Sequence, residues 1–291
     1  MIFFKLVHDI FLLTLAIGHI ESVVLDKDFL EQFYPNGYDY EIVDLIGKNL
    51  TSIDLSTFVG LTNTERLYLS TNKLVELQAN SFIGLDNLIY LYFIRNQISS
   101  IEADTFRGLF NLRYLYLMQN SLTNLNSTMF NGLTNLEYLW LTLNQIHLVE
   151  PTSFTNLVNL KSLGLDENQI TSIQSNTFSS LYRLENLWLN SNSLLSIDPN
   201  TLLPLRNLRT IRLNNNNLSK IGPETFYGLA KLRLIRLSSN KLISIDRLTF
   251  VGLTNLEELY LDLNPITSIL PTTVKNLCST NPKCFVFIGY N

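Results

Sequence analysis

Asparagine recurs at every twenty-fourth position through nine consecutive copies of one repeat. The nine residues are Asn72, Asn96, Asn120, Asn144, Asn168, Asn192, Asn216, Asn240 and Asn264. Each lies in the same apolar frame, LxxLxLxxNxL, which is formed for example by Leu112, Leu115, Leu117, Asn120 and Leu122. A fixed period in this range is the sequence mark of a stacked solenoid, and nine copies in one register exclude chance.

The L-x-L core of each repeat predicts a short strand, as in Leu67-Tyr68-Leu69. Alternate side chains of a strand point to opposite faces, so the two leucines face inward and the middle residue faces outward. Connections of about twenty residues permit only parallel pairing of successive strands, in the right-handed sense. We therefore expect a curved parallel sheet of about ten strands that lines a concave face.

Two ladders of the repeat have structural roles. The amide of each ladder asparagine can donate to and accept from backbone groups that the turn leaves unpaired, including those of the adjacent coil. Ten residues later comes an apolar ladder, which we expect to stack beneath the convex side. Its members are Phe58, Phe82, Phe106, Phe130, Phe154, Phe178, Leu202, Phe226, Phe250 and Val274. Glycine and proline nearby favour turns and short helical segments there over long helices.

The frame resembles the leucine-rich repeat family, in its 24-residue extracellular form. The resemblance implies an α/β fold, a right-handed solenoid or horseshoe, and a use as a binding surface. We expect four segments: a signal peptide (1–18), an N-terminal cap without cysteines (19–41), the repeats (42–277) and a short C-terminal cap (278–291). The missing N-terminal cysteines depart from the cysteine-rich caps that extracellular members commonly carry.

The first residues have the pattern of a secretory signal. Lys5 supplies a positive charge, residues 10–17 are apolar, and Ala16 and Gly18 are small residues suited to a cut after Gly18. The alternative is a membrane anchor, but eight uninterrupted apolar residues fall far short of the ~20 needed to span a bilayer. We expect a secreted protein without a membrane span. The net charge of −4 gives no general attraction to nucleic acid.

The two cysteines, Cys278 and Cys284, are close together near the end of the sequence. In a secreted protein such a pair is most often bridged. We expect a small disulfide that closes the C-terminal cap, and the alternative is two thiols that are free or paired with another chain.

Outward strand positions make the candidate ligand surface. Those selected are Tyr68, Tyr90, Tyr92, Tyr114, Tyr116, Tyr138, Trp140, Trp188, Arg212 and Arg236. Tyrosine and tryptophan are enriched at recognition hot spots, which favours a partner-binding surface. The alternative is that aromatic neighbours on adjacent strands only stabilise the sheet.

A basic patch is expected on two adjacent strands beside the aromatic residues. Its members are Arg209, Arg212, Arg233 and Arg236. The alternative is that Glu257 and Glu258 on the next strand pair with these arginines.

Three N-x-S/T sequons begin at Asn49, Asn126 and Asn217. In a secreted chain each is a candidate for N-glycosylation, although such short strings also arise by chance.

The sequence shows no arrangement of residues typical of a catalytic site. His19 and His147, the histidines of the predicted mature chain, have no evident nucleophile beside them. The two cysteines lack the companions of a zinc site. Consecutive Glu257 and Glu258 are expected on opposite faces of a strand. We expect neither an enzyme nor a cofactor.

The sequence therefore predicts a secreted, non-enzymatic protein that binds another protein, or alternatively a glycan, through its concave face. The resemblance implies roles in innate immunity, extracellular matrix or cell-surface adhesion. Alternatives are a self-associating protein, such as a homodimer, and a non-catalytic subunit of a secreted complex.

Overall fold

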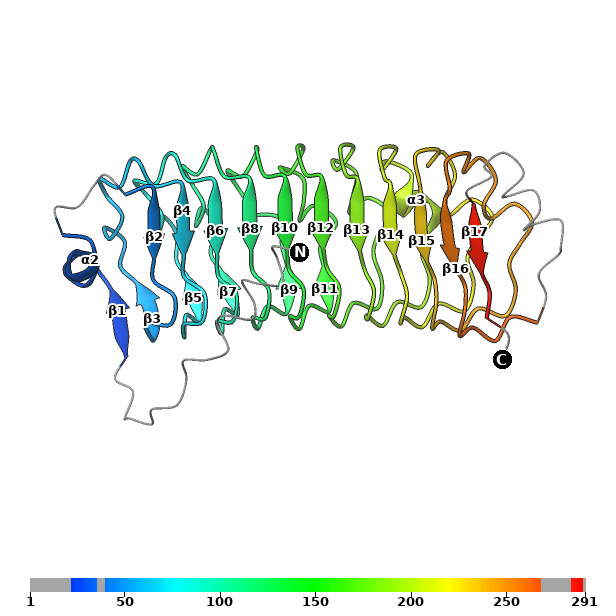
Figure 1. Cartoon of the computed structure of the whole chain (residues 1–291), viewed down its shortest axis with the longest axis horizontal. Coiled ribbons are helices and arrows are strands. Elements are labelled where there is room, and N and C mark those ends of the chain that lie inside the picture. The colour runs from blue at the N-terminus through cyan, green and yellow to red at the C-terminus, as the bar shows by residue number, and fades with distance from the viewer. Residues whose placement is uncertain (1–21, 36–39, 268–283, 290–291) are drawn as a thin grey trace.

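The computed structural model describes residues 22–35, 40–267 and 284–289. Its main feature is an eleven-stranded sheet along one side of a long stack of coils (Figure 1). In spatial order its strands are β2 (Ile42–Asp44), β4 (Arg66–Tyr68), β6 (Tyr90–Tyr92), β8 (Tyr114–Tyr116), β10 (Tyr138–Trp140), β12 (Ser162–Gly164), β13 (Asn186–Trp188), β14 (Thr210–Arg212), β15 (Leu234–Arg236), β16 (Glu258–Tyr260) and β17 (Phe285–Phe287).

All neighbouring strands of this sheet are parallel and follow the repeat in register. Leu67 pairs with Leu91, and each later pair through β16 is likewise offset by one repeat. The predicted parallel solenoid with 24-residue repeats is confirmed. Strand β17 is an eleventh strand from the segment expected to be a short cap, and it pairs Phe287 with Tyr260.

Shorter strands pair away from the main sheet. Strand β1 (Val23–Leu25) pairs with β3 (Leu50–Ile53), β5 (Glu76–Leu77) with β7 (Ser100–Ile101), and β9 (Asn124–Leu125) with β11 (Leu148–Val149). The segments that connect the strands of the repeats are mostly turns, apart from the short helix α3 (Pro199–Leu202). The expectation of turns rather than long helices is therefore confirmed.

A continuous core runs the length of the stack. The frame leucines are buried, and most neighbouring rings of the phenylalanine ladder stack on one another. Phe58 lies 5.9 Å from Phe82, and Phe154 lies 6.1 Å from Phe178, between ring centroids. Val274 of this ladder lies outside the described residues.

The asparagine ladder joins each coil to the one before it. The Oδ1 atom of Asn144 accepts the N–H of Leu122 at 3.0 Å. Its Nδ2 atom donates to the carbonyls of Leu117 and Leu141 at 2.9 and 3.0 Å. The other ladder asparagines bond in the same way, so buried backbone groups of two coils are satisfied by one side chain.

The N-terminal segment covers the first coil with α2 (Lys27–Phe33). Asp26 caps this helix by accepting the N–H of Phe29 at 2.7 Å. After the helix, the Tyr34 hydroxyl donates to the carbonyl of Asp44 on β2 at 3.1 Å. The hydroxyl also accepts the N–H of Asp44, so it satisfies backbone groups on the edge strand of the sheet.

Candidate functional site

The candidate site is the solvent-facing surface of the eleven-stranded sheet, which we call the concave face. Each strand of this sheet from β2 to β16 buries its middle residue and turns its two flanking residues outward. Because the register is constant, these residues form straight columns across the strands. The central column contains Asp44, Tyr68, Tyr92, Tyr116, Trp140, Gly164, Trp188, Arg212, Arg236, Tyr260 and Phe287.

Six tyrosines of the N-terminal half form two stacks on the concave face. In the central column, Tyr92 stacks between Tyr68 at 4.6 Å and Tyr116 at 4.5 Å, between ring centroids. In the neighbouring column, Tyr114 stacks between Tyr90 at 4.4 Å and Tyr138 at 4.6 Å. The planes within each stack are within 14° of parallel. The rings therefore hold one another in fixed orientations.

Stacking limits which tyrosines a ligand could touch. Tyr116 is only 7% exposed, although its position on the strand is outward as expected. Burial raises the pKa of Tyr116 to about 12, and the pKa of Tyr92 is also raised by burial. Tyr116 therefore offers little area to a ligand and mainly packs against its neighbours. Tyr90, Tyr114 and Tyr138 remain half-exposed.

The two tryptophans meet across an intervening strand. Trp140 on β10 and Trp188 on β13 are separated by β12, yet their ring centroids are 4.7 Å apart. Gly164 lies between them in register, and a Cβ atom there would overlap the Trp140 ring. Sequence reasoning missed this contact. Its signal is the glycine flanked by two tryptophans in the central column.

The four arginines of the expected basic patch separate into two kinds. Arg209 lies 3.5 Å from Glu185, and Arg233 lies 3.9 Å from Glu257. Arg212 and Arg236 instead lie over aromatic rings, 5.9 Å from the Trp188 centroid and 5.0 Å from that of Tyr260.

Of the two glutamates that could neutralise the basic patch, only Glu257 pairs with one of its arginines. Glu257 pairs with Arg233, while Glu258 accepts the Tyr260 hydroxyl at 2.9 Å. Burial lowers the pKa of the Arg212 guanidinium, and the charge of Arg236 lowers it further.

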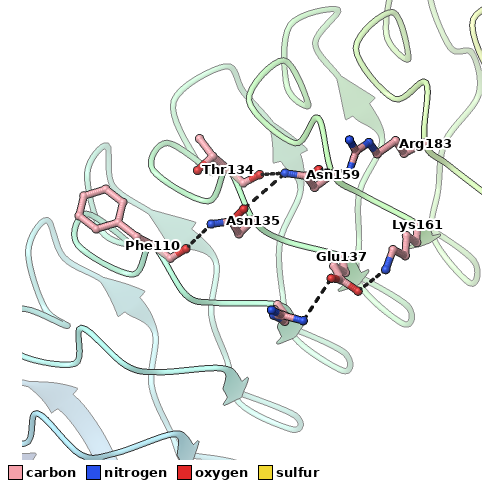
Figure 2. Close-up of polar contacts among 8 residues, drawn as sticks. Phe110, Thr134, Asn135, Glu137, Asn159, Lys161 and Arg183 are labelled. Atoms are coloured by element: carbon pink, nitrogen blue, oxygen red, sulfur yellow. Dashed lines mark hydrogen bonds and ion pairs between the residues drawn. The ribbon is translucent and has the colours of Figure 1, made fainter.

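A charged and amide-rich strip flanks the concave face (Figure 2). Glu137 lies between Lys161 at 2.7 Å and Arg113 at 3.6 Å. Beside it, Asn135 donates to the carbonyl of Phe110 and Asn159 donates to that of Thr134, each at 2.8 Å. A second set of asparagines thus repeats every 24 residues, and the same periodicity that gave the buried ladder could have revealed it.

Among the described residues, no three histidine, cysteine, aspartate or glutamate side chains gather as metal ligands. The expectation that Glu257 and Glu258 face opposite ways is wrong, because both line one shallow depression with Tyr260 and Phe285. Strict alternation does not extend to Glu257 because β16 begins one residue later.

Other predicted sites lie partly outside the described residues. Cys278 and residues 1–18 are among those outside, so the disulfide with Cys284 and the signal peptide remain predictions. Asn49 is exposed, while Asn126 and Asn217 are half-buried. No helix in the described ranges combines the length and apolar character needed to cross a membrane.

Comparison with solved structures finds the same fold in several proteins. One is a TLR13–single-stranded RNA complex, at 29% identity and a TM-score of 0.68, covering 76% of this chain and 33% of that chain. Another is a leucine-rich repeat protein of Leptospira interrogans, at 25% identity and a TM-score of 0.60, covering 84% of this chain and 65% of the other. This chain thus spans about a third of the first and under two thirds of the second.

A third structure, the Toll–Spatzle complex of Drosophila, has 22% identity and a TM-score of 0.64, covering 77% of this chain and 35% of the other. It supports the fold alone. No curated protein matches the sequence. The family model described as leucine rich repeat matches residues 41–92, 66–122, 110–170, 158–218 and 206–266. With its repeats matched over most of the sequence, the chain belongs to the leucine-rich repeat family.

Proposed function

We propose that this protein is a secreted, non-enzymatic binding protein that recognises a protein ligand through its concave face. The observation that carries the proposal is the Trp140–Trp188 pair above Gly164, beside the two tyrosine stacks. Tryptophan and tyrosine supply large contact areas with few rotatable bonds. Because stacking already fixes these rings, a ligand would lose little affinity to ordering them.

Sheet stability explains the tyrosines better than it explains the tryptophans. Adjacent strands bring tyrosines of one column into contact, and such contacts stabilise a sheet without any ligand. Trp140 and Trp188 are two strands apart, and they meet only because the strand between them carries Gly164. Both rings remain half-exposed. Their arrangement is therefore the stronger argument for a recognition surface.

The comparisons support binding and leave the ligand open. The structure at 29% identity is a complex with single-stranded RNA. For this chain a protein ligand fits better than RNA. The net charge is −4, and the central and neighbouring columns carry only Arg66, Arg212 and Arg236 as cations within the described strands. Innate immunity, extracellular matrix and cell adhesion are the settings we propose.

Secretion and glycosylation belong to the same proposal. Residues 1–18 have the pattern of a signal peptide. Of the three sequons, Asn126 has a defined turn, because its Oδ1 atom accepts from the backbone N–H and the hydroxyl of Thr128, each at 3.0 Å. Asn126 follows the short strand β9 and lies outside the eleven-stranded sheet, so a glycan there would leave the concave face open.

Affinity capture tests this function directly. The secreted form would be immobilised and exposed to the extracellular fluid of its source, alongside a Trp140→Ala/Trp188→Ala variant. We expect the wild type to retain a protein that the folded variant loses, at a cost of about 2 kcal/mol or more in affinity. Retention of the same protein by both would place binding elsewhere on the molecule.

Self-association is a second candidate, favoured by the C-terminal end of the sheet. Phe285 and Phe287 on β17 are 53% and 44% exposed, and no described strand pairs with the outer edge of β17. An exposed edge strand with apolar side chains is a template for pairing with another chain. Sedimentation of the wild type as a monomer at micromolar concentration would exclude an obligate dimer.

A further inference from the structure

The concave face carries two neighbouring arginines whose positive charge is not balanced by an ion pair. Arg212 and Arg236 are directly paired in the register of β14 and β15, so their backbones are about 4.8 Å apart. No carboxylate among the described residues lies within 4.0 Å of either guanidinium. Residues 268–283, which precede β17, contain no aspartate or glutamate to supply one.

Carboxylates in the neighbourhood are engaged elsewhere. Asp166 accepts the Thr142 hydroxyl at 2.9 Å, and Glu258 accepts that of Tyr260. Arg209 and Arg233 lie three residues earlier on the same coils. Unlike Arg212 and Arg236, each of them forms an ion pair with a glutamate. The outer arginines thus each have a close ion pair, whereas Arg212 is attracted only by the more distant charge of Asp166 and neither inner arginine has a carboxylate in contact.

Both inner arginines are positioned rather than free to extend into solvent. Arg212 lies over Trp188 and Arg236 lies over Tyr260, and both side chains are half-buried. Their Nε atoms are buried without a hydrogen-bond partner among the described residues. Two like charges held side by side destabilise each other, and an anion placed between them removes that repulsion.

We propose that Arg212 and Arg236 together bind a side-chain carboxylate of the protein ligand, an aspartate or glutamate next to an apolar group that packs on Trp188. Guanidinium groups bind carboxylates through paired, charge-assisted hydrogen bonds, which gives the ligand a fixed orientation. This inference rests on the proposed function, since it names the chemistry of the ligand for the same face.

An isolated acidic side chain fits this site better than a nucleic acid. A nucleic acid requires several cations spaced along its backbone, and it is held mainly by phosphate contacts. On this sheet the third outward arginine, Arg66, lies on β4, six strands from β14 in spatial order, and it is paired with Glu41 at 3.1 Å. The outward arginines without an ion pair are therefore confined to two adjacent strands, β14 and β15.

Arginine side-chain NMR of the full secreted protein tests the site without knowledge of the ligand. The probe is N-acetyl-aspartate amide, with N-acetyl-asparagine amide as the uncharged match, at constant low salt. We expect the Nε–H signals of Arg212 and Arg236 to shift together and to saturate with the aspartate probe alone. The signals of Arg209 and Arg233 should stay unchanged.

Three outcomes would overturn the inference. One is no shift at Arg212 and Arg236. Another is an equal shift at all four arginines, which would indicate general screening. A third is binding of inorganic phosphate at least tenfold tighter than the aspartate probe, which would make phosphate the ligand chemistry.

Paired variants separate this inference from the function on which it rests. With a captured partner, Arg212→Gln/Arg236→Gln should weaken binding on the order of tenfold or more, whereas the matched Arg209→Gln/Arg233→Gln should change it less than about twofold. Equal binding by both variants, with loss in Trp140→Ala/Trp188→Ala, would overturn the arginine inference and leave the concave-face function standing. Retention in all three variants would contradict the proposed function itself.

Discussion

Two asparagines of one repeat provide a sharp test of what holds the coils together. Asn135 and Asn144 are nine residues apart, and both donate hydrogen bonds to backbone carbonyls of the preceding coil. They differ in burial, since Asn144 is buried and Asn135 is exposed. We expect Asn144→Ala to destabilise the protein severely and Asn135→Ala to have a small effect.

The expected magnitude follows from the groups left unpaired. Asn144→Ala removes the partner of one N–H and two carbonyls, those of Leu122, Leu117 and Leu141. At about 1–3 kcal/mol for each orphaned buried group, with some relief from local rearrangement, the cost is about 3–6 kcal/mol. Asn135→Ala exposes one carbonyl that water can reach, so its cost is below about 1 kcal/mol.

Urea unfolding followed by circular dichroism would measure both variants against the wild type. A loss of 3–6 kcal/mol is a large fraction of the roughly 5–15 kcal/mol typical of a folded domain, so the Asn144→Ala midpoint should fall far below that of Asn135→Ala. Equal effects of the two substitutions would refute the reasoning, because burial would then not decide the cost of an unpaired backbone group.

Three further predictions concern the concave face and the turns. Gly164→Ala should displace the Trp140 ring, change the tryptophan fluorescence spectrum and cost about 1–3 kcal/mol in unfolding free energy, whereas Gly222→Ala, which meets only ordinary contacts, should leave the spectrum unchanged. An unchanged spectrum in Gly164→Ala would contradict the Trp140–Trp188 arrangement. The pKa of Tyr116 is raised to about 12, so the folded state holds its proton more tightly than the unfolded state, and stability should fall as pH rises from about 10 to 12. Phenolate absorbance during a pH titration checks this, and complete tyrosine ionisation near pH 10 in the folded protein would disprove it. Leu263 has a φ angle of +54°, which a β-carbon disfavours, so Leu263→Asn should raise the unfolding free energy by a few tenths of a kcal/mol or more in urea melts. A loss of stability there would show that the exposed leucine contributes more by packing than its backbone costs.

Much of the fold could be predicted because one period determines it. Inward leucines, the buried phenylalanine ladder and the ladder asparagines all follow from counting by 24. The eleventh strand did not follow, because Phe287 pairs with Tyr260 after 27 residues and the repeat frame has ended by then. Sequence periodicity cannot place a strand that leaves the period.

The site was predicted less completely because it depends on contacts between side chains. Columns can be read from the repeat, but residues two strands apart are about 9.6 Å apart at the backbone and are not expected to touch. Trp140 and Trp188 touch because Gly164 leaves space between them. In the same way, the sequence does not distinguish the four arginines of the basic patch. The structure does, because Glu185 pairs with Arg209 and Glu257 pairs with Arg233.

Oxidative footprinting with a captured partner tests the central claim, recognition by the concave face, most directly. Trp140 and Trp188 report on the concave face, while Tyr182 and Tyr227, which are 50% and 66% exposed away from the sheet strands, serve as internal controls. We predict that the partner lowers the oxidation of both tryptophans and leaves both tyrosines unchanged. Protection of Tyr182 or Tyr227 with unchanged oxidation of Trp140 and Trp188 would contradict recognition by the concave face.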